Sequence, residues 1–302
     1  MAVCPPYLLE LVKGARPLRT AVVNAGSAVV MESVRDAVAA GLIEPVLFGD
    51  PDAMAREAGA LGFDISAYDS VAASDEESAA REAALATGRG EAAALLKGQV
   101  HTDVFMRAVL SRDANLRLGR PLTHVFHMSA PAREKPLLIT DGALNPAPDV
   151  EMKKSIIANA VALAHAVGIA RPQVALLSAT EEPSPRIPSS TEAVQLTGWA
   201  KDAVEGADVY GPLAFDLAVS EEAARIKGVS LPVAGKADVL VVPEIVCGNA
   251  LFKMMVQFMD ACAAGIVLGA KVPVLLTSRA DPPQARLASL ALAAAMQRAS
   301  GG

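Results

Sequence analysis

The chain is poor in cysteine, histidine and aromatic residues. Its 302 residues include three cysteines, four histidines and only 4% aromatic residues. Cys4, Cys247 and Cys262 form no CxxC pair and lie at no metal-binding spacing from histidine, which argues against a zinc site or a disulfide framework. With so few rings, the core must consist mainly of Ala, Val, Leu and Ile. This composition favours Ala-rich helices packed on Val-rich strands.

Long apolar runs and clusters of basic residues are also missing. No uninterrupted apolar run approaches the roughly 20 residues needed to span a bilayer, and Met1–Arg16 lacks the pattern of a signal peptide. Asp and Glu outnumber Lys and Arg by 33 to 27, for a net charge of −6. We therefore expect an acidic, soluble, cytoplasmic protein that binds neither nucleic acid nor membrane. A few arginines and helix N-termini can still hold a phosphate-rich ligand.

Short apolar runs alternate with amphipathic stretches along most of the chain, a rhythm typical of βαβ units with a parallel sheet. Strands are predicted at 20–24, 45–49, 93–97, 173–177, 208–211, 237–242 and 272–277. Helices are predicted at 25–40, 52–60, 75–87, 102–110, 151–167, 191–204, from 216 onward, 250–264 and 282–298.

The middle of the chain differs from this rhythm. The apolar runs 122–128 and 137–140 are separated by the polar turn 130–135, and we expect them to pair as a hairpin. The chain length suits about two domains, and we place the change of domain near this turn.

The segment 277–281 carries the strongest chemical signal, because Thr277, Ser278, Arg279 and Asp281 follow a strand directly. A hydroxyl, a guanidinium and a carboxylate at the carboxyl end of a strand can hold an oxyanion, grip a phosphate with two hydrogen bonds and accept a proton. A helix N-cap with a structural Arg–Asp pair is an equally good interpretation of the spacing.

Other candidate positions carry weaker signals. Gly248 and Asn249 are predicted at a helix start, where backbone N–H groups suit a phosphate, although a capped helix explains them equally well. The same two interpretations apply to Gly211 and Pro212 with Asp216.

Residues of three further types are candidates for a functional role. Arg107 could reach back toward the N-terminal end of its helix, although a solvated side chain is the simpler interpretation. His124 and His127 are three apart in a strand, so we expect neutral core histidines rather than metal ligands. Cys247, near a Gly-containing helix start, could have a lowered thiol pKa, but the sequence shows no histidine base for it, and a structural or ligand-adjacent role is the preferred interpretation.

Taken in order, several segments resemble phosphate acetyltransferases and phosphate butyryltransferases. The segments are LLKGQVHTDVFMRAVL, LTHVFHMSAP, TDGALNPAPD, YGPLAFDLA, ADVLVVPEIVCGNALFK and VPVLLTSRAD. The resemblance covers most of the chain, from about Arg19 to Met296.

The resemblance implies two α/β domains with mostly parallel sheets flanked by helices, an active-site cleft between them and a similarity to isocitrate and isopropylmalate dehydrogenases. The first domain would comprise residues 1–134 and be completed by 269–302. The second, 135–268, would carry the contacts of a homodimer.

The implied reaction is reversible transfer of a short acyl group, acetyl or butyryl, between coenzyme A and inorganic phosphate in a ternary complex. Acyl-CoA, phosphate and acyl phosphate would be the ligands, an acyl kinase a functional partner, and no metal or tightly bound cofactor would be needed.

The resemblance also implies roles for single residues. Ser278 and Arg279 match the Ser-Arg pair of the family, which is thought to hold the acyl phosphate. Asp281 is the nearest carboxylate and the candidate base, and SRAD matches the butyryl-type pattern, whereas acetyl-type members carry their acid further along the helix. The remaining matches are expected to bind coenzyme A or line the cleft: Arg107, Gly211, Pro212, Asp216, Gly248, Asn249 and Thr277.

Two other classes of protein are alternatives to a phosphate acyltransferase. A non-catalytic acyl-CoA sensor is the main alternative, and binding without turnover would identify it. A metal- and NAD-dependent dehydrogenase requires clustered Asp or His ligands, and the sequence shows no Asp-rich motif of that kind.

Overall fold

The computed structural model describes residues 3–277 and 281–300. The chain forms two compact units. The continuous unit is Pro121–Ala263, and the composite unit combines Ala2–Arg120 with Ala264–Gly302. The chain therefore leaves the composite unit after Arg120 and returns to it at Ala264.

The composite unit is built on a mostly parallel sheet. β1 pairs in parallel with β2 and β4, and β4 with β11, whereas β10 and β11 are antiparallel. Across the sheet the strands are β3 (Ser70–Ala72), β2 (Ile43–Gly49), β1 (Leu18–Val23), β4 (Ala94–Lys97), β11 (Val274–Leu275) and β10 (Cys262–Leu268), the last beginning at the boundary between the units.

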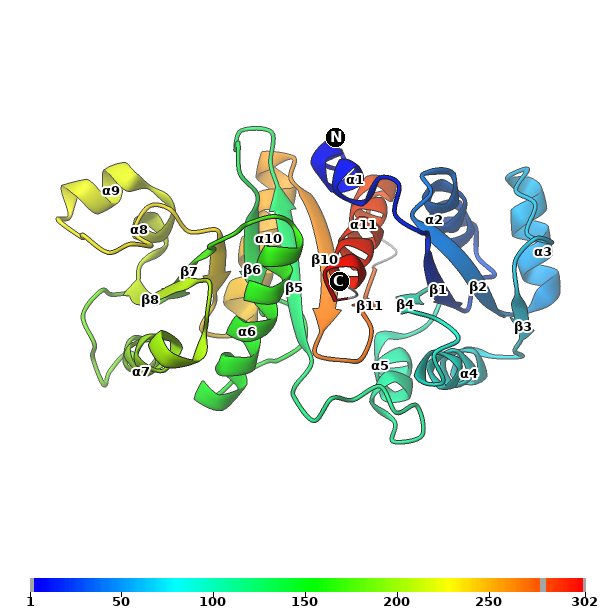
Figure 1. Ribbon diagram of the computed structural model, residues 1–302, viewed down its shortest axis with the longest axis horizontal. Coiled ribbons are helices and arrows are strands. Elements are labelled where there is room, and N and C mark those ends of the chain that lie inside the picture. The colour runs from blue at the N-terminus through cyan, green and yellow to red at the C-terminus, as the bar shows by residue number, and fades with distance from the viewer. Residues whose placement is uncertain (1–2, 278–280, 301–302) are drawn as a thin grey trace. The chain divides into compact units, whose positions relative to one another are not determined.

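Helices cover both faces of this sheet. Figure 1 shows α1, α2 and α11 together on one side of the strands and α4 with α5 on the other. The helices are α1 (Pro6–Val12), α2 (Ala28–Ala39), α3 (Pro51–Ala60), α4 (Glu76–Gly88), α5 (Thr102–Leu110) and α11 (Pro283–Ser300).

In the continuous unit the strands of the sheet are again mostly parallel. β5 and β6 form the predicted antiparallel hairpin, with Val125 opposite Thr140, and the other neighbours are parallel. The strands across this sheet are β5 (Thr123–Ser129), β6 (Leu137–Thr140), β9 (Val239–Val241), β7 (Gln173–Leu177) and β8 (Asp208–Leu213).

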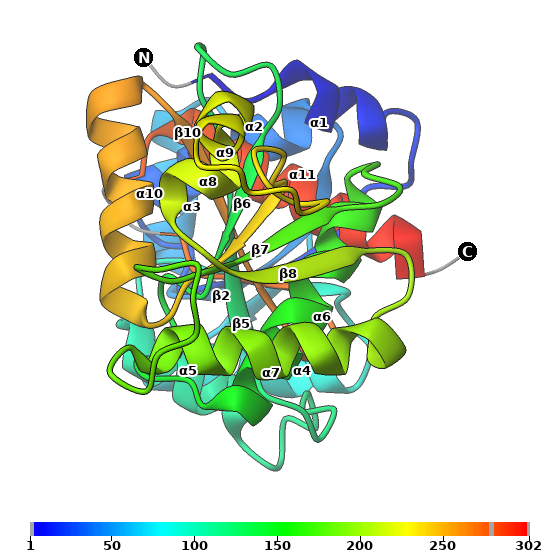
Figure 2. The same ribbon diagram turned by 90° about the vertical axis from the view of Figure 1, so that its left-hand side faces the viewer.

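Figure 2 shows the layers of this unit, with α7 and α6 on one side of β7 and β8 and α8 and α9 on the other. The helices are α6 (Val150–Ala166), α7 (Pro188–Ala203), α8 (Phe215–Val219), α9 (Glu221–Ile226) and α10 (Ile245–Met259).

The boundary between the units lies earlier than the one expected near Glu134. The polar turn around Glu134 connects β5 to β6, and both strands belong to the continuous unit. Met128 and Ala130 before the turn pack in the same buried cluster as Leu137 after it. A hairpin whose two strands share one core cannot be divided between two domains. The polar composition of the turn therefore did not mark the domain boundary.

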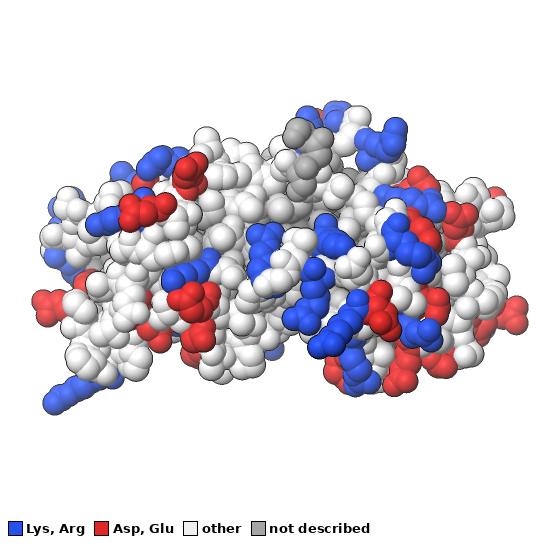
Figure 3. All heavy atoms as spheres, turned by 60° about the horizontal axis from the view of Figure 1, so that its bottom comes forward, with Lys and Arg blue, Asp and Glu red and all other residues white. Residues whose placement is uncertain are grey.

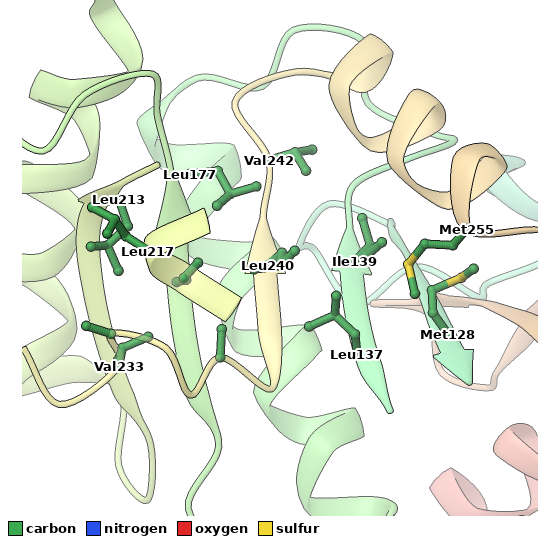
Figure 4. Close-up of a cluster of buried hydrophobic side chains, with 14 of the residues drawn as sticks. Met128, Leu137, Ile139, Leu177, Leu213, Leu217, Val233, Leu240, Val242 and Met255 are labelled. Carbon is green, nitrogen blue, oxygen red and sulfur yellow. The ribbon is translucent and has the colours of Figure 1, made fainter. Parts of the chain in front are cut away.

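That buried cluster fills the side of the sheet that faces α8 and α10. Figure 4 shows Leu137, Ile139, Leu177 and Leu240 of the strands within this cluster, with Met255 of α10 beside Met128. The side chains are aliphatic or methionine, as the scarcity of aromatic residues predicts.

The predicted helix over 250–264 was wrong over its last five residues. α10 ends at Met259, because Asp260 adopts a left-handed conformation with φ of 51°. The following residues form β10, whose sequence Cys-Ala-Ala-Gly-Ile-Val-Leu begins with helix-favouring residues. Alanine suits a helix locally, and the tertiary environment overrides this preference.

No helix among residues 3–277 and 281–300 is long and apolar enough to cross a membrane.

Candidate functional site

In the composite unit, the carboxyl ends of β4 and β11 are held side by side. Leu275 of β11 pairs with Leu96 of β4, and the Thr277 hydroxyl donates to the Lys97 carbonyl oxygen over 3.1 Å. Gly98 follows at a point where a Cβ atom would lie 2.0 Å from the Val23 carbonyl oxygen. Only glycine fits there, so the backbone at this edge has little freedom to shift.

Arg286 of α11 is buried beside this edge, with 6% of its surface exposed. Its Nη1 donates to the Asp281 carbonyl oxygen over 2.5 Å, and its Nη2 lies 3.9 Å from the Glu32 carboxylate. Its Nε is buried without a hydrogen-bond partner among the described residues. Arg286 thereby ties α11 to the segment that follows β11.

A small pocket opens between these groups. Its polar lining comes from Lys97, Thr277, Arg286 and Ser33, and its apolar wall includes Leu290. Two buried cationic side chains at the carboxyl ends of parallel strands favour an anionic ligand nearby.

Of the predicted catalytic residues, Asp281 is half-buried beside Arg286. Ser278 and Arg279 lie outside the described residues.

Arg107 is not brought to this pocket. It lies on α5, 69% exposed, within 3.3 Å of the Asp103 carboxylate and 3.9 Å of the Glu77 carboxylate. It lines a separate hollow of about 210 Å³ with Glu77, Arg81 and Ser111. Exposed ion pairs of this kind contribute little to stability.

In the continuous unit, Gly211 and Pro212 lie near the carboxyl end of β8, joined by a cis peptide bond. A Cβ atom on Gly211 would lie 2.6 Å from the Leu176 carbonyl oxygen. The Gly211 N–H donates to the Thr197 hydroxyl over 3.1 Å. Close packing of β8 on β7 therefore accounts for the glycine.

Asp216 lies in the first turn of α8, where it is not the N-cap, because that position belongs to Ala214. Its carboxylate is half-exposed and 3.4 Å from the Lys227 ammonium. It faces solvent beside a cationic neighbour.

Gly248 and Asn249 lie one turn inside α10 rather than at its start. The first N–H groups of the helix are already bonded, because the Glu244 carboxylate accepts from Val246 and Cys247, each over 2.8 Å. The predicted phosphate cradle of free N–H groups is therefore occupied by a side chain of the protein.

Packing explains why residue 248 is glycine. Its Cβ atom would lie 2.8 Å from the Gly142 Cα atom and 2.9 Å from the Asp141 carbonyl oxygen. Asn249 reaches the Gly142 carbonyl oxygen over 3.4 Å. These contacts fix α10 to the turn that follows β6.

Asp141 organises that turn. Its carboxylate, 1% exposed, accepts hydrogen bonds from the backbone N–H groups of His124, Ala143 and Leu144 and from the Asn145 amide, at 2.6–3.0 Å. A buried carboxylate with this many donors is well compensated for its lost hydration.

The prediction of neutral core histidines is confirmed. His124 and His127 are both buried. Burial lowers the pKa of His124 to about 4, against a smaller opposing effect of Asp141, and it lowers the pKa of His127 to about 4 as well. Both rings are therefore uncharged at neutral pH.

The alternative of a lowered thiol pKa at Cys247 does not hold. Burial raises the pKa of the Cys247 thiol, and the nearby Glu244 carboxylate raises it further. The same carboxylate that caps α10 thus makes Cys247 a poor nucleophile.

Sequence reasoning missed Arg286, Asp141 and Glu244. The Asp141 position was contained in the TDGALN segment, and Glu244 precedes a predicted helix as an N-cap can. Arg286 gave no local signal, because its role depends on a contact back to Asp281 and across to Glu32. Among the described residues, no group of three or more His, Cys, Asp or Glu side chains could hold a metal ion.

Comparisons with known proteins agree on one family. The family model described as phosphate acetyl/butaryl transferase matches residues 76–294. A phosphate acetyltransferase from Rhizobium meliloti is 40% identical over 95% of this chain and 91% of its own length. A phosphate butyryltransferase from Clostridium acetobutylicum is 38% identical over 95% of this chain and 96% of its own.

The fold agrees with a solved relative. The crystal structure of a branched-chain phosphotransacylase from Enterococcus faecalis V583 matches with a TM-score of 0.81 at 34% identity, covering 92% of this chain and 99% of that one.

The fold and the sequence together define an acyltransferase of the two-substrate, phosphate-using class. The chain belongs to the phosphate acetyl/butyryl transferase family.

Proposed function

We propose that the protein transfers a short acyl group reversibly between coenzyme A and inorganic phosphate. Family membership over most of the chain carries this proposal. The arrangement of Thr277, Lys97 and Arg286 at one edge of a parallel sheet supports it, because anionic ligands bind at the carboxyl ends of strands.

In the proposed reaction the coenzyme A sulfur attacks the carbonyl carbon of the acyl phosphate. The tetrahedral intermediate collapses with cleavage of the carbon–oxygen bond, phosphate leaves, and the thiol proton passes to a base. No covalent acyl-enzyme and no metal enter this scheme. A free thiol has a pKa of roughly 8.5, so most of the coenzyme is protonated at neutral pH and a base accelerates attack.

Arg279 and Ser278 are assigned to the oxygens. Arg279 grips two phosphate oxygens and Ser278 donates to the oxyanion as it develops. Asp281 is the proposed base, and its half-buried position in the sequence neighbourhood of the pair supports this role. Thr277 completes the segment through its bond to Lys97.

The remaining predicted residues keep supporting roles in the proposal. Arg107 is assigned to the phosphates of coenzyme A, a role that requires it to exchange its contacts with Asp103 and Glu77. Gly211, Pro212, Asp216, Gly248 and Asn249 are assigned to shaping the substrate site. For both Gly211 and Gly248 the closest contacts support a packing role.

The SRAD sequence at 278–281 favours a butyryl group or a broader range of acyl groups over acetyl alone. The relatives support both choices, since one is named an acetyltransferase and another a butyryltransferase.

The decisive experiment mixes the purified protein with coenzyme A and either acetyl phosphate or butyryl phosphate and follows thioester formation. Arg279→Ala is expected to lower kcat by about 10²–10³-fold. Asp281→Asn is expected to lower it by about 10²–10⁴-fold if that carboxylate is the base. Tight binding of acyl-CoA without turnover of either acyl phosphate would overturn the enzyme assignment and favour the sensor.

Several finer predictions accompany this proposal. We expect no tightly bound cofactor, a cytoplasmic location and a functional link to an acyl kinase. The similarity to isocitrate and isopropylmalate dehydrogenases stays a prediction.

We further propose a homodimer formed through α10. This helix is apolar, yet only Gly248 and Met255 among its residues are buried. Val246 and Phe258 are 68% and 84% exposed, and Met254 is 38% exposed. Exposed apolar groups gathered on one element favour a contact with another protein surface, and the resemblance to the family names a second copy as that partner.

A further inference from the structure

A hollow lined by charged side chains lies at one end of the strands of the continuous unit. It has a volume of about 790 Å³ and lies entirely within the continuous unit. Its walls come from the turn between β5 and β6, the segment before β7, the start of α9 and the segment before β9. In Figure 1 and Figure 2 that turn and α9 lie at the same end of the unit.

This end is the amino end of the parallel strands. Pro136 precedes β6, Gln173 and Asp208 begin β7 and β8, and Asp238 precedes β9. Substrates of open α/β sheets bind at the carboxyl ends, where Gly211 lies and where α10 begins after β9. The hollow is therefore separate from the substrate site within this unit.

The charges around the hollow are unevenly compensated. Four cationic side chains and three carboxylates line it: Arg133, Lys135, Arg171, Lys236, Asp208, Glu221 and Asp238.

Two of the carboxylates are already engaged. Arg171 binds the Asp208 carboxylate through two hydrogen bonds of 2.9 and 2.7 Å, and Asp208 also accepts from the Gln173 amide over 2.9 Å. Asp238 accepts from the Gln173 backbone N–H over 2.9 Å.

The remaining cations have no such partner. Arg133, Lys135 and Lys236 form no ion pair within the described residues, and the Arg133 Nε is buried without a hydrogen bond there. A buried N–H group without a partner carries a desolvation penalty that a bound anion would remove. Lys135 and Lys236 are exposed and Arg133 is half-buried, so this hollow carries an excess of cations in a chain whose net charge is −6.

The wall beside α9 is rigid before any ligand arrives. Gly235 approaches the helix so closely that a Cβ atom would lie 2.4 Å from the Glu221 Cα atom. The N–H groups of Gly235, Ala237 and Asp238 donate to backbone carbonyl oxygens at 2.7–3.0 Å. A preformed wall lowers the ordering penalty that binding otherwise incurs.

We propose that this hollow binds the di- or triphosphate end of a nucleotide. Guanidinium and ammonium groups from Arg133, Lys135 and Lys236 suit several phosphate oxygens at once. Ile169 and Pro232 give an apolar surface for a base, and the Glu221 carboxylate can accept hydrogen bonds from ribose hydroxyls. The volume is within the roughly 300–1,000 Å³ of small-molecule sites.

Two sources share this chemistry, a free nucleotide and the adenosine diphosphate part of coenzyme A. Calorimetric titration of the full chain with ATP, and separately with coenzyme A, distinguishes them. If coenzyme A is the source, it binds at two sites per chain, because the proposed catalytic site also takes it. If a free nucleotide is the source, ATP binds at one site here and coenzyme A binds only at the catalytic site.

The double variant Arg133→Gln/Lys236→Gln tests the location. We expect it to weaken ATP binding at least tenfold, or to remove one of the two coenzyme A sites. Lys201→Gln, an exposed lysine on α7 of the same unit, is the matched control and is expected to bind as the wild type does. The thermal midpoint of Arg133→Gln is expected not to fall, because its Nε has no hydrogen bond to lose.

Equal binding of both probes to the wild type and the double variant would overturn the inference, as would the absence of ATP binding together with a single coenzyme A site. The binding assay needs no turnover. A protein that fails to transfer acyl groups but loses nucleotide binding in the double variant would refute the proposed function and leave this site in place.

Discussion

Arg286 is the described residue whose environment most directly connects packing to the proposed chemistry. Arg286 is 6% exposed, so its guanidinium has lost most of its hydration and requires compensation from protein groups. It receives this from the Asp281 carbonyl oxygen and, more distantly, from Glu32. We infer that Arg286 positions the main chain at Asp281, two residues beyond Arg279.

Replacing Arg286 with Gln removes the hydrogen bond that holds the main chain at Asp281. We expect kcat to fall by up to about 10²-fold with little change in KM, because misplacing a reacting group by about 1 Å has effects of this size. Arg286→Lys keeps the charge and is expected to retain more activity. Steady-state kinetics with both acyl phosphates would measure this, and circular dichroism would check that the variants are folded.

A loss of stability without any change in kcat would show that Arg286 is only a packing residue. A large rise in KM for phosphate would instead place it in contact with substrate.

The two buried histidines make a prediction about pH. Burial lowers the pKa of both His124 and His127 from 6.5 to about 4. Between these values the unfolded chain binds protons that the folded chain does not. The free energy of unfolding is therefore expected to fall as pH falls from about 6.5 to about 4, by up to about 1.4 kcal/mol per pH unit for each histidine.

Urea unfolding at a series of pH values would measure this slope. His127→Leu is expected to flatten it, because this variant lacks one of the two buried imidazoles. Equal slopes in the wild type and His127→Leu would contradict the assignment of this pH dependence to buried imidazole.

At the scale of elements, the join between α10 and the turn after β6 is the most constrained contact near the predicted site residues. Gly248→Ala would force a methyl group to within 2.8 Å of the Gly142 Cα atom and 2.9 Å of the Asp141 carbonyl oxygen. Both contacts are to backbone, so the helix must shift. We expect a loss of about 1–3 kcal/mol in the free energy of unfolding.

The same substitution in α7 provides the control. Gly198 is an exposed glycine inside that helix, and a Cβ atom there meets nothing within 4 Å. Gly198→Ala is expected to stabilise the protein by about 0.5–1 kcal/mol, because alanine is the better helix former. Denaturant unfolding of the two variants side by side tests the comparison, and similar effects of both changes would refute the packing explanation for Gly248.

The elements that sequence could predict are those whose local signals agree with their surroundings. The hairpin of β5 and β6, the strand at Gln173–Leu177 and the helix at Thr102–Leu110 all appear as predicted. α4 begins close to its predicted start, where Asp75 and Ser78 form a capping box. In these segments the hydrophobic periodicity and the helix caps predict the same secondary structure that the fold contains.

The incorrect predictions concern residues whose structure or pKa is determined by contacts with residues distant in the sequence. β10 looks helical until its neighbours in the sheet are known, and the Gly248 segment looks like an open helix start until Glu244 is seen to cap it. Cys247 shows the same limitation, since burial and Glu244 reverse the direction that its helix start favours for its pKa. The candidate site could be predicted as a set of motifs, whereas the partners of each motif could not.

At the scale of the molecule, the distribution of charge on the face drawn in Figure 3 does not indicate where another protein would bind. Figure 3 shows acidic and basic side chains present together over the face drawn there, so the net charge of −6 does not form one continuous acidic field on it. The apolar residues of α10 are then the stronger basis for a partner.

The variant Phe258→Glu tests whether the apolar residues of α10 form the dimer contact. The wild type is expected to have twice the 31.1 kDa mass of one chain in light scattering, and the variant the mass of one. Ile226→Glu is the matched control, because Ile226 is also largely exposed, at 70%, but lies on α9. A monomeric wild type, or a Phe258→Glu protein that stays dimeric, would contradict the proposed interface.

The return of the chain to the composite unit sets an order of events during synthesis. All residues of Pro121–Ala263 have left the ribosome before the last residues of the composite unit are made. The composite unit must wait, because β4 lacks its neighbour β11, and α1 lacks α11, until the last residues are made. A nascent chain stopped after Arg120 would thus hold exposed strand edges in search of a partner, whereas one stopped shortly after Ala263 would already carry every residue of the continuous unit.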